Sequence, residues 1–153
     1  MPVVRLFNIG GGIMSLGKVL LIDDEKEYCQ ILEKFFTLEG FQVECAHDGE
    51  GGVLKAIDWE PEVVVLDIRM PKKGGMYFLE NFIRPTKTRI IVVSALQDQD
   101  ILEKCVELGV DDYISKPIDV MELKAKIEDS LKLSCPPEPA INNLSDTVRY
   151  KKL

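Results

Sequence analysis

The chain has 153 residues, a formal net charge of −7 and a hydrophobic fraction of 46%. This length suits one domain with a self-supporting core, and no apolar run approaches the roughly 20 residues that a membrane span requires. The negative charge, without a cluster of lysine and arginine, argues against general binding to nucleic acid.

Residues 1–17 lack the charge and apolar length of a signal peptide. They contain one basic residue, Arg5, and a short apolar patch interrupted by Asn8. We interpret them as an N-terminal appendage. The glycines at 10–12 motivate the hypothesis that Met14 is the true start, because a ribosome-binding run, if translated, would encode glycine there.

From Lys18 onward, strand-like segments alternate with helix-like segments. Strands are predicted where apolar runs are short, and helices where apolar residues recur three or four positions apart. Strands are expected at 18–22, 41–46, 62–67, 89–94 and 112–115, and helices at 25–38, around 53–57, and at 76–83, 101–108 and 120–133.

The spacing of apolar residues also predicts which side of each helix is buried. In the first helix the predicted apolar face comprises Tyr28, Ile31, Leu32, Phe35 and Phe36. In the second it comprises Val53, Leu54 and Ile57, before Pro61 ends the segment.

Strict alternation with apolar strands predicts an α/β fold, in which a parallel sheet is covered by helices on both faces. Residues 18–133 are assigned to this domain. Residues 134–153 contain three prolines within a few positions and no sustained periodicity, so we expect a flexible tail.

Polar residues stand where the predicted strands end. Asp23 and Asp24 follow the first strand, Asp67 closes the third, Ser94 closes the fourth and Lys116 follows the fifth. Because the carboxyl ends of parallel strands share one edge, we expect these side chains to converge.

Three carboxylates close together repel one another, and an oxygen-only ligand set suits Mg²⁺. Lys116 adds a positive charge placed to meet an anion. The simplest interpretation is that Asp67 acts as a nucleophile toward a phosphoryl group, that Mg²⁺ and Lys116 neutralise the charge, and that Ser94 donates its hydroxyl to a phosphoryl oxygen.

The segments "LLIDDE", "VVVLDIRMP", "IIVVSA" and "DDYISKP" resemble the receiver domain of two-component response regulators, of the stand-alone, chemotaxis-regulator-like kind. The resemblance covers about residues 18–133. It implies a flavodoxin-like, doubly wound sheet of five parallel strands in the order 2-1-3-4-5, with five helices.

The resemblance also implies a role for each matching residue. Asp67 accepts a phosphoryl group from a sensor histidine kinase or a histidine phosphotransfer protein. The implied Mg²⁺ ligands are Asp23, Asp24, Asp67 and the backbone carbonyl of Arg69, and the implied phosphoryl-binding residues are Ser94, Ala95 and Lys116. The resemblance implies that Ser94 and Tyr113 form the conformational switch and that the peptide bond before Pro117 is cis. It also implies that Arg69 and Leu96 set the rate of dephosphorylation.

A receiver is a signalling switch rather than an enzyme acting on a separate substrate. The implied output surface spans about residues 98–133, through which a downstream protein or a phosphorylation-dependent dimer would bind. We expect a cytoplasmic protein that binds neither membrane nor nucleic acid. The scattered cysteines (Cys29, Cys45, Cys105 and Cys135) fit reduced thiols in packing or surface positions.

Two other functions fit the sequence less well. A phosphohydrolase of the haloacid-dehalogenase type would carry a second aspartate two residues after the nucleophile, where this chain has Arg69. A nucleotide or flavin binder would carry a glycine-rich loop after the first strand, where this chain has acids. His47 is expected to be a surface turn residue outside the acidic cluster.

Overall fold

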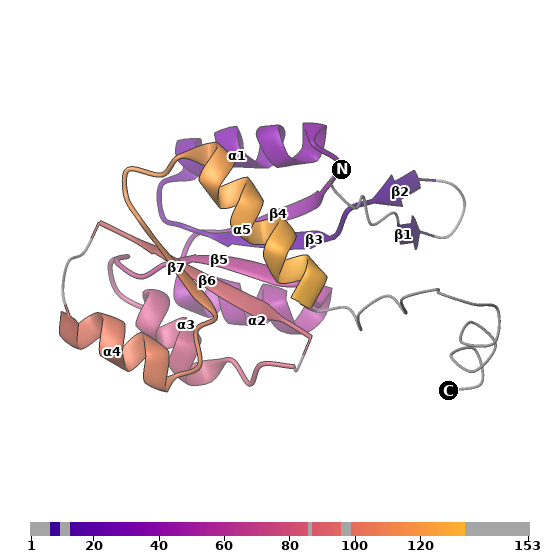
Figure 1. Ribbon diagram of the computed structural model, residues 1–153. Coiled ribbons are helices and arrows are strands. Elements are labelled where there is room, and N and C mark those ends of the chain that lie inside the picture. The colour runs from indigo at the N-terminus through magenta and orange to yellow at the C-terminus, as the bar shows by residue number, and fades with distance from the viewer. Residues whose placement is uncertain (1–6, 10–12, 86, 96–98, 134–153) are drawn as a thin grey trace, which may run out of the picture.

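A five-stranded parallel sheet forms the centre of the computed structural model, which describes residues 7–9, 13–85, 87–95 and 99–133 (Figure 1). The strands lie side by side in the order β4-β3-β5-β6-β7. This is the predicted order 2-1-3-4-5, which is confirmed. The strands are β3 (Lys18–Ile22), β4 (Gln42–Ala46), β5 (Val63–Asp67), β6 (Arg89–Ser94) and β7 (Asp112–Ser115).

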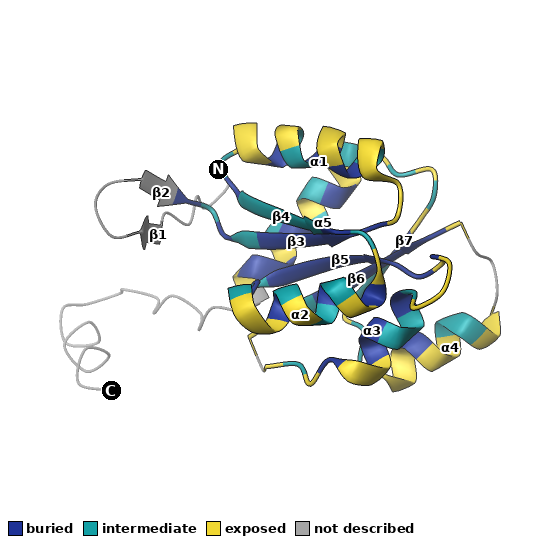
Figure 2. Cartoon of the chain, turned by 180° about the vertical axis from the view of Figure 1, so that it is seen from behind, coloured by how far each residue is buried: buried dark blue, intermediate teal, exposed yellow. Residues whose placement is uncertain are grey.

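Helices cover both faces of this sheet (Figures 1 and 2). One face carries α1 (Lys26–Leu38) and α5 (Val120–Leu133), and the other carries α2 (Gly49–Trp59), α3 (Gly75–Asn81) and α4 (Gln99–Glu107). The boundaries fall within a few residues of the predicted ones, although α3 ends before Ile83, which is 94% exposed. Among the described residues no helix is long and apolar enough to span a membrane.

The core has two layers because successive strand residues point to opposite faces of the sheet. Val19 and Leu21 pack with residues of α1 and α5, whereas Leu20 and Ile22 pack with residues of α2 and α3. Every residue of β5 is buried, including its last residue, Asp67.

The buried face of α2 agrees with the predicted one only at Val53, which is half-buried and packs against the core. Leu54 and Ile57 are 65% and 64% exposed, and the buried residues are Gly49, Gly52 and Ala56. A Cβ atom on Gly52 would lie 2.6 Å from Cδ1 of Ile22. The helix therefore lies so close to the sheet that only small residues fit beneath it.

The buried stripe of α1 also differs from the prediction, at Cys29 and Ile31. Cys29, Leu32 and Phe36 are buried, whereas Ile31 is 62% exposed. At 3.6 residues per turn, Ile31 lies about 100° around the helix from Leu32. Its apolar side chain therefore points away from the sheet.

A short antiparallel pair precedes the sheet, formed by β1 (Phe7–Ile9) and β2 (Ile13–Ser15), and was not predicted. Contact with the rest of the domain begins before residue 18, because Ser15 is buried and the Leu16 N–H donates to the Gly40 carbonyl at 2.9 Å. The hypothesis about Met14 and the appendage stays a prediction. The predicted tail at 134–153 lies outside the described residues.

Candidate functional site

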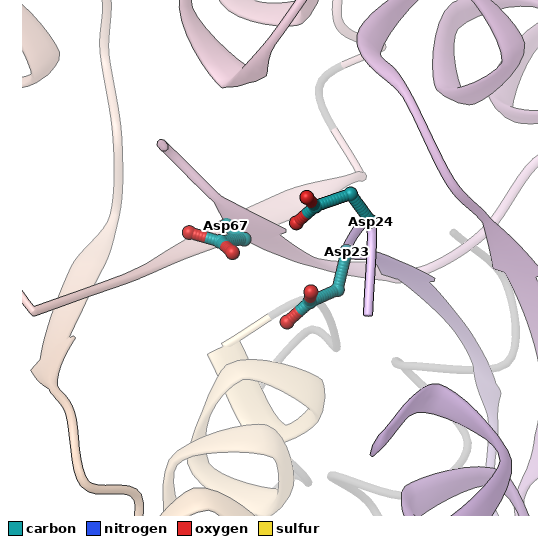
Figure 3. Close-up of side chains that lie close together, drawn as sticks. All are labelled: Asp23, Asp24 and Asp67. Carbon is teal, nitrogen blue, oxygen red and sulfur yellow. The ribbon is translucent and has the colours of Figure 1, made fainter. Parts of the chain in front are cut away.

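Three carboxylates gather at the carboxyl edge of the sheet (Figure 3). Asp23 and Asp24 follow β3, and Asp67 ends β5, which is hydrogen-bonded to β3. One carboxylate oxygen from each lies within 4.8 Å of the others. Asp23 and Asp67 are buried, whereas Asp24 is exposed. The convergence predicted for these three residues is therefore present.

Lys116 follows β7 and reaches into the same cluster. Its Nζ atom lies 3.1 Å from Oδ2 of Asp67 and 3.6 Å from Oδ2 of Asp23. The backbone N–H of Lys116 donates to the Ser94 carbonyl at 2.9 Å, which ties the start of this loop to β6. The bond between Lys116 and Pro117 is cis, as the resemblance implied.

Burial controls the protonation of this cluster. Desolvation raises the pKa of Asp67 above 3.8, and outweighs the hydrogen bond and charge of Lys116, which lower it. Desolvation also raises the pKa of Asp23; the Glu25 N–H lowers it and the charge of Asp67 raises it again. Burial lowers the pKa of Lys116, but the hydrogen bond and charge of Asp67 outweigh this and raise it. The cluster contains three carboxylates and one ammonium, that of Lys116, so its negative charge exceeds its positive charge.

The backbone fixes one oxygen of each buried carboxylate. Oδ1 of Asp23 accepts from the Glu25 N–H at 2.9 Å, and Oδ1 of Asp67 accepts from the Arg69 N–H at 3.1 Å. Asp24 makes no hydrogen bond or ion pair with the described residues. A cluster of pre-aligned carboxylate oxygens with excess negative charge fits Mg²⁺, which prefers oxygen ligands and retains water.

The loop between β5 and α3 folds closely around Asp67, and glycine makes this possible. A Cβ on Gly75 would lie 2.5 Å from the Asp67 carbonyl oxygen and 2.6 Å from Cα of Ile68. A Cβ on Gly49 would lie 2.2 Å from the Gly74 carbonyl oxygen. The sequence did not single out Gly49 or Gly75, because the backbone atoms that each one meets become its neighbours only in the fold.

The side chain of Tyr113 on β7 reaches the backbone of Ser94 on β6. Ser94 is 1% exposed at the end of β6, the strand adjacent to β5. The Tyr113 hydroxyl lies 3.5 Å from the backbone carbonyl oxygen of Ser94 and can donate to it. Ala95 follows and is exposed. The positions agree with the implied switch pair, and the roles stay predictions.

The two residues assigned to dephosphorylation differ in what the structure describes. Arg69 is exposed beside Asp67, and its N–H donates to Oδ1 of Asp67. The implied role of its carbonyl as a metal ligand stays a prediction. Leu96 lies outside the described residues.

His47 is closer to the cluster than predicted. Its Nδ1 atom lies 3.0 Å from the backbone carbonyl oxygen of Asp23. The side chain is half-buried rather than on the surface, but His47 is not one of the three residues whose ligand atoms cluster, as expected. The strand order explains the contact. Because β4 pairs with β3, the residue after β4 lies beside the residue after β3. The predicted order 2-1-3-4-5 already contained this signal.

Comparisons with known proteins identify relatives of this chain. A family model described as "Response regulator receiver domain" matches residues 19–128. The transcriptional regulatory protein CpxR of Escherichia coli K12 is 36% identical over 128 residues, which is 84% of this chain and 55% of CpxR. CpxR of Klebsiella pneumoniae is 36% identical over 119 residues, 78% of this chain and 51% of that protein. This chain therefore spans about half the length of these curated relatives.

Solved structures show the same architecture. A CheY-like receiver domain protein of Methanospirillum hungatei JF-1 superposes with a TM-score of 0.73 at 25% identity, covering 77% of this chain and 95% of that chain. A chain of the CheX–CheY–BeF3–Mg²⁺ complex of Borrelia burgdorferi superposes with a TM-score of 0.68 at 32% identity, covering 77% and 90%.

Proposed function

The chain belongs to the response regulator receiver family, and we propose that Asp67 is its phosphoacceptor. The observation that carries this proposal is the placement of Asp67 at the end of β5, with Oδ2 3.1 Å from the Lys116 ammonium and Oδ1 held by the Arg69 N–H. A carboxylate oxygen fixed beside a cation is suited to attack phosphorus, and the cation offsets charge on the transferred group.

We further propose that Asp23, Asp24 and Asp67, with the Arg69 backbone carbonyl, hold Mg²⁺. The bound ion would supply charge neutralisation for phosphoryl oxygens. The side chains of Ser94 and Lys116 and the backbone of Ala95 would bind the phosphoryl group. In the transfer, the bond from phosphorus to the donor's imidazole nitrogen breaks as the bond to the Asp67 oxygen forms. The protein is thus proposed to be a switch that phosphorylates itself, not an enzyme acting on a separate substrate.

The proposed donor is a sensor histidine kinase or a histidine phosphotransfer protein, in the cytoplasm. Phosphorylation would reposition Ser94, the last residue of β6, and Tyr113 of the neighbouring strand β7, with its hydroxyl 3.5 Å from the Ser94 carbonyl oxygen. The proposed response reaches about residues 98–133, where α4, β7 and α5 form a surface for a downstream protein or a second copy. The receiver would comprise residues 18–133, preceded by the segment 1–17 and followed by the tail.

The test is covalent labelling with acetyl phosphate, read as the gain of one phosphoryl group by intact-protein mass spectrometry. Wild type should be labelled only when Mg²⁺ is present, and Asp67→Asn should not be labelled. Asp58→Asn, at an exposed position on α2, is the matched control and should behave as wild type. Undiminished labelling of Asp67→Asn would show that the phosphoacceptor lies elsewhere.

Beryllofluoride provides a second readout, because it binds aspartate as a non-reactive analogue of the phosphoryl group. Its binding should require both Mg²⁺ and Asp67. Binding to Asp67→Asn with unchanged affinity would contradict the proposed site.

A further inference from the structure

The backbone of Asp23 is held by several groups outside its own loop. Its N–H donates to the Ala46 carbonyl at 3.0 Å, at the end of β4. Its carbonyl oxygen lies 3.0 Å from Nδ1 of His47 and 3.5 Å from Sγ of Cys29 on α1. The peptide group that joins Asp23 to Asp24 is thus contacted from both β4 and α1.

The direction of the His47 contact follows from chemistry. A carbonyl oxygen can only accept a hydrogen bond, so Nδ1 must carry the proton and donate it. The ring is partly buried beside the loop. This contact fixes the orientation of the ring and also the orientation of the Asp23 carbonyl.

The orientation of that carbonyl determines where Asp24 lies. Rotation of the peptide group would change ψ of Asp23 and φ of Asp24 together, and would swing the Asp24 carboxylate away from Asp67. Asp24 has no hydrogen bond or ion pair of its own with the described residues that would resist this movement. Its position within 4.8 Å of the other ligand oxygens therefore depends on the backbone.

We propose that His47 is a positioning residue for the metal site: its Nδ1–H holds the Asp23 carbonyl and so presets the Asp23 and Asp24 carboxylates. This inference rests on the proposed function, because it presumes that these carboxylates bind Mg²⁺. His47 would not touch the ion. It would lower the cost of ordering two ligands when the ion binds.

The test compares the Mg²⁺ dissociation constants of four proteins by titration calorimetry, at about pH 8, where an ordinary imidazole is neutral. His47→Ala removes the donor and should weaken Mg²⁺ binding by about tenfold, the lower end for groups that orient metal ligands, because the Cys29 thiol remains. His47→Asn should restore binding close to wild type, because Nδ2 of asparagine, like Nδ1 of histidine, lies one bond beyond Cγ.

Ile127→Val is the control for a general loss of stability. It removes one methyl group from the fully buried core beneath α5, away from the loop. Urea unfolding without Mg²⁺ would show how far each variant is destabilised. If His47 positions the ligands, His47→Ala should lose Mg²⁺ affinity and Ile127→Val should not. If His47 only supports the fold, His47→Ala and Ile127→Val should each lose Mg²⁺ affinity in proportion to their loss in free energy of unfolding.

The outcomes separate the two proposals. If wild type binds no Mg²⁺, the metal site fails and the positioning role fails with it. If wild type binds Mg²⁺ and His47→Ala binds equally well, only the positioning role is overturned. Failure of His47→Asn to restore affinity, or an equal loss in Ile127→Val, would also overturn it.

Discussion

Gly75→Ala should damage both the fold and the phosphoacceptor, because the added methyl group meets the backbone of Asp67 itself. The new Cβ would lie 2.5 Å from the Asp67 carbonyl oxygen, where ordinary contacts begin at 3.4 Å, an overlap of about 0.9 Å. It would also lie 2.6 Å from Cα of Ile68. Neither atom belongs to a flexible side chain, so relief requires α3 or the end of β5 to move.

The overlap sets the expected magnitudes. Overpacking of this kind costs about 1–3 kcal/mol, and contact with two backbone atoms favours the upper half of that range. A displacement approaching 1 Å at the nucleophile slows a positioned reaction by about 100-fold. Helix propensity acts in the opposite direction, since alanine is preferred to glycine by about 0.5–1 kcal/mol.

Two assays check this prediction. Urea unfolding measures the loss in free energy of unfolding, and labelling by acetyl phosphate at saturating Mg²⁺ measures the rate at Asp67. Gly51→Ala on α2 is the matched control, because its Cβ would meet only Oδ1 of the Asp48 side chain, at 3.2 Å. The reasoning is refuted if Gly75→Ala is as stable and as rapidly labelled as Gly51→Ala.

Lys116→Ala should retain Mg²⁺ binding, because the carboxylates remain, but should uncouple phosphorylation from the response at α4 and α5; a loss of Mg²⁺ affinity as severe as in Asp24→Ala would contradict this. Burial raises the pKa of Asp23 and of Asp67 above 3.8. The contribution of these two groups to the free energy of unfolding is therefore full below pH 3.8, and it declines as the pH rises through the raised pKa values and the buried carboxylates ionise. Stabilisation by Mg²⁺ should therefore be larger at about pH 7.5 than at about pH 4.5, and equal shifts in the urea midpoint would argue against it. On phosphorylation, backbone NMR shifts should extend from Ser94 to Tyr113, and shifts confined to the acidic cluster would count against the switch. The double variant Arg69→Asn, Leu96→Glu should release phosphate faster than wild type, because Arg69 and Leu96 are expected to keep water from the aspartyl phosphate, whereas the new side chains would admit and orient it; equal or slower release would exclude this role.

The acidic cluster could be predicted from local signals in the sequence, whereas the strand order 2-1-3-4-5 was implied by the resemblance to receiver domains. Each strand is a short apolar run, and each run ends in a polar residue that must leave the core. In a parallel sheet those ends share one edge, so Asp23, Asp67 and Lys116 had to converge. Knowledge of the strand pattern was sufficient.

The buried helix faces depended on distances that the pattern does not contain, whereas the His47 contact followed from the strand order but was not worked out from it. Apolar spacing favoured Leu54 and Ile57 as the buried face of α2, but the close approach of Gly52 to Ile22 leaves room only for small residues. The contact from His47 to the Asp23 carbonyl required the neighbour relation of β3 and β4 to be applied residue by residue. The β1–β2 pair joins two three-residue strands, which are too short for the apolar pattern to reveal.

The contact between Gly17 and α5 makes the domain a candidate for circular permutation. A Cβ on Gly17 would lie 2.9 Å from Cδ2 of Leu131, so the residue before β3 touches the last turns of α5. Gly17 precedes β3, whereas Asp23 and Asp24 follow the other end of that strand, so this contact lies at the edge of the sheet opposite the carboxylates. A short linker could join the end of α5 to the start of β3, and new ends could be opened in an exposed connection elsewhere. Such a circular permutant would keep every neighbour relation of the five-stranded sheet and the acidic cluster, while changing which segments are consecutive in the chain.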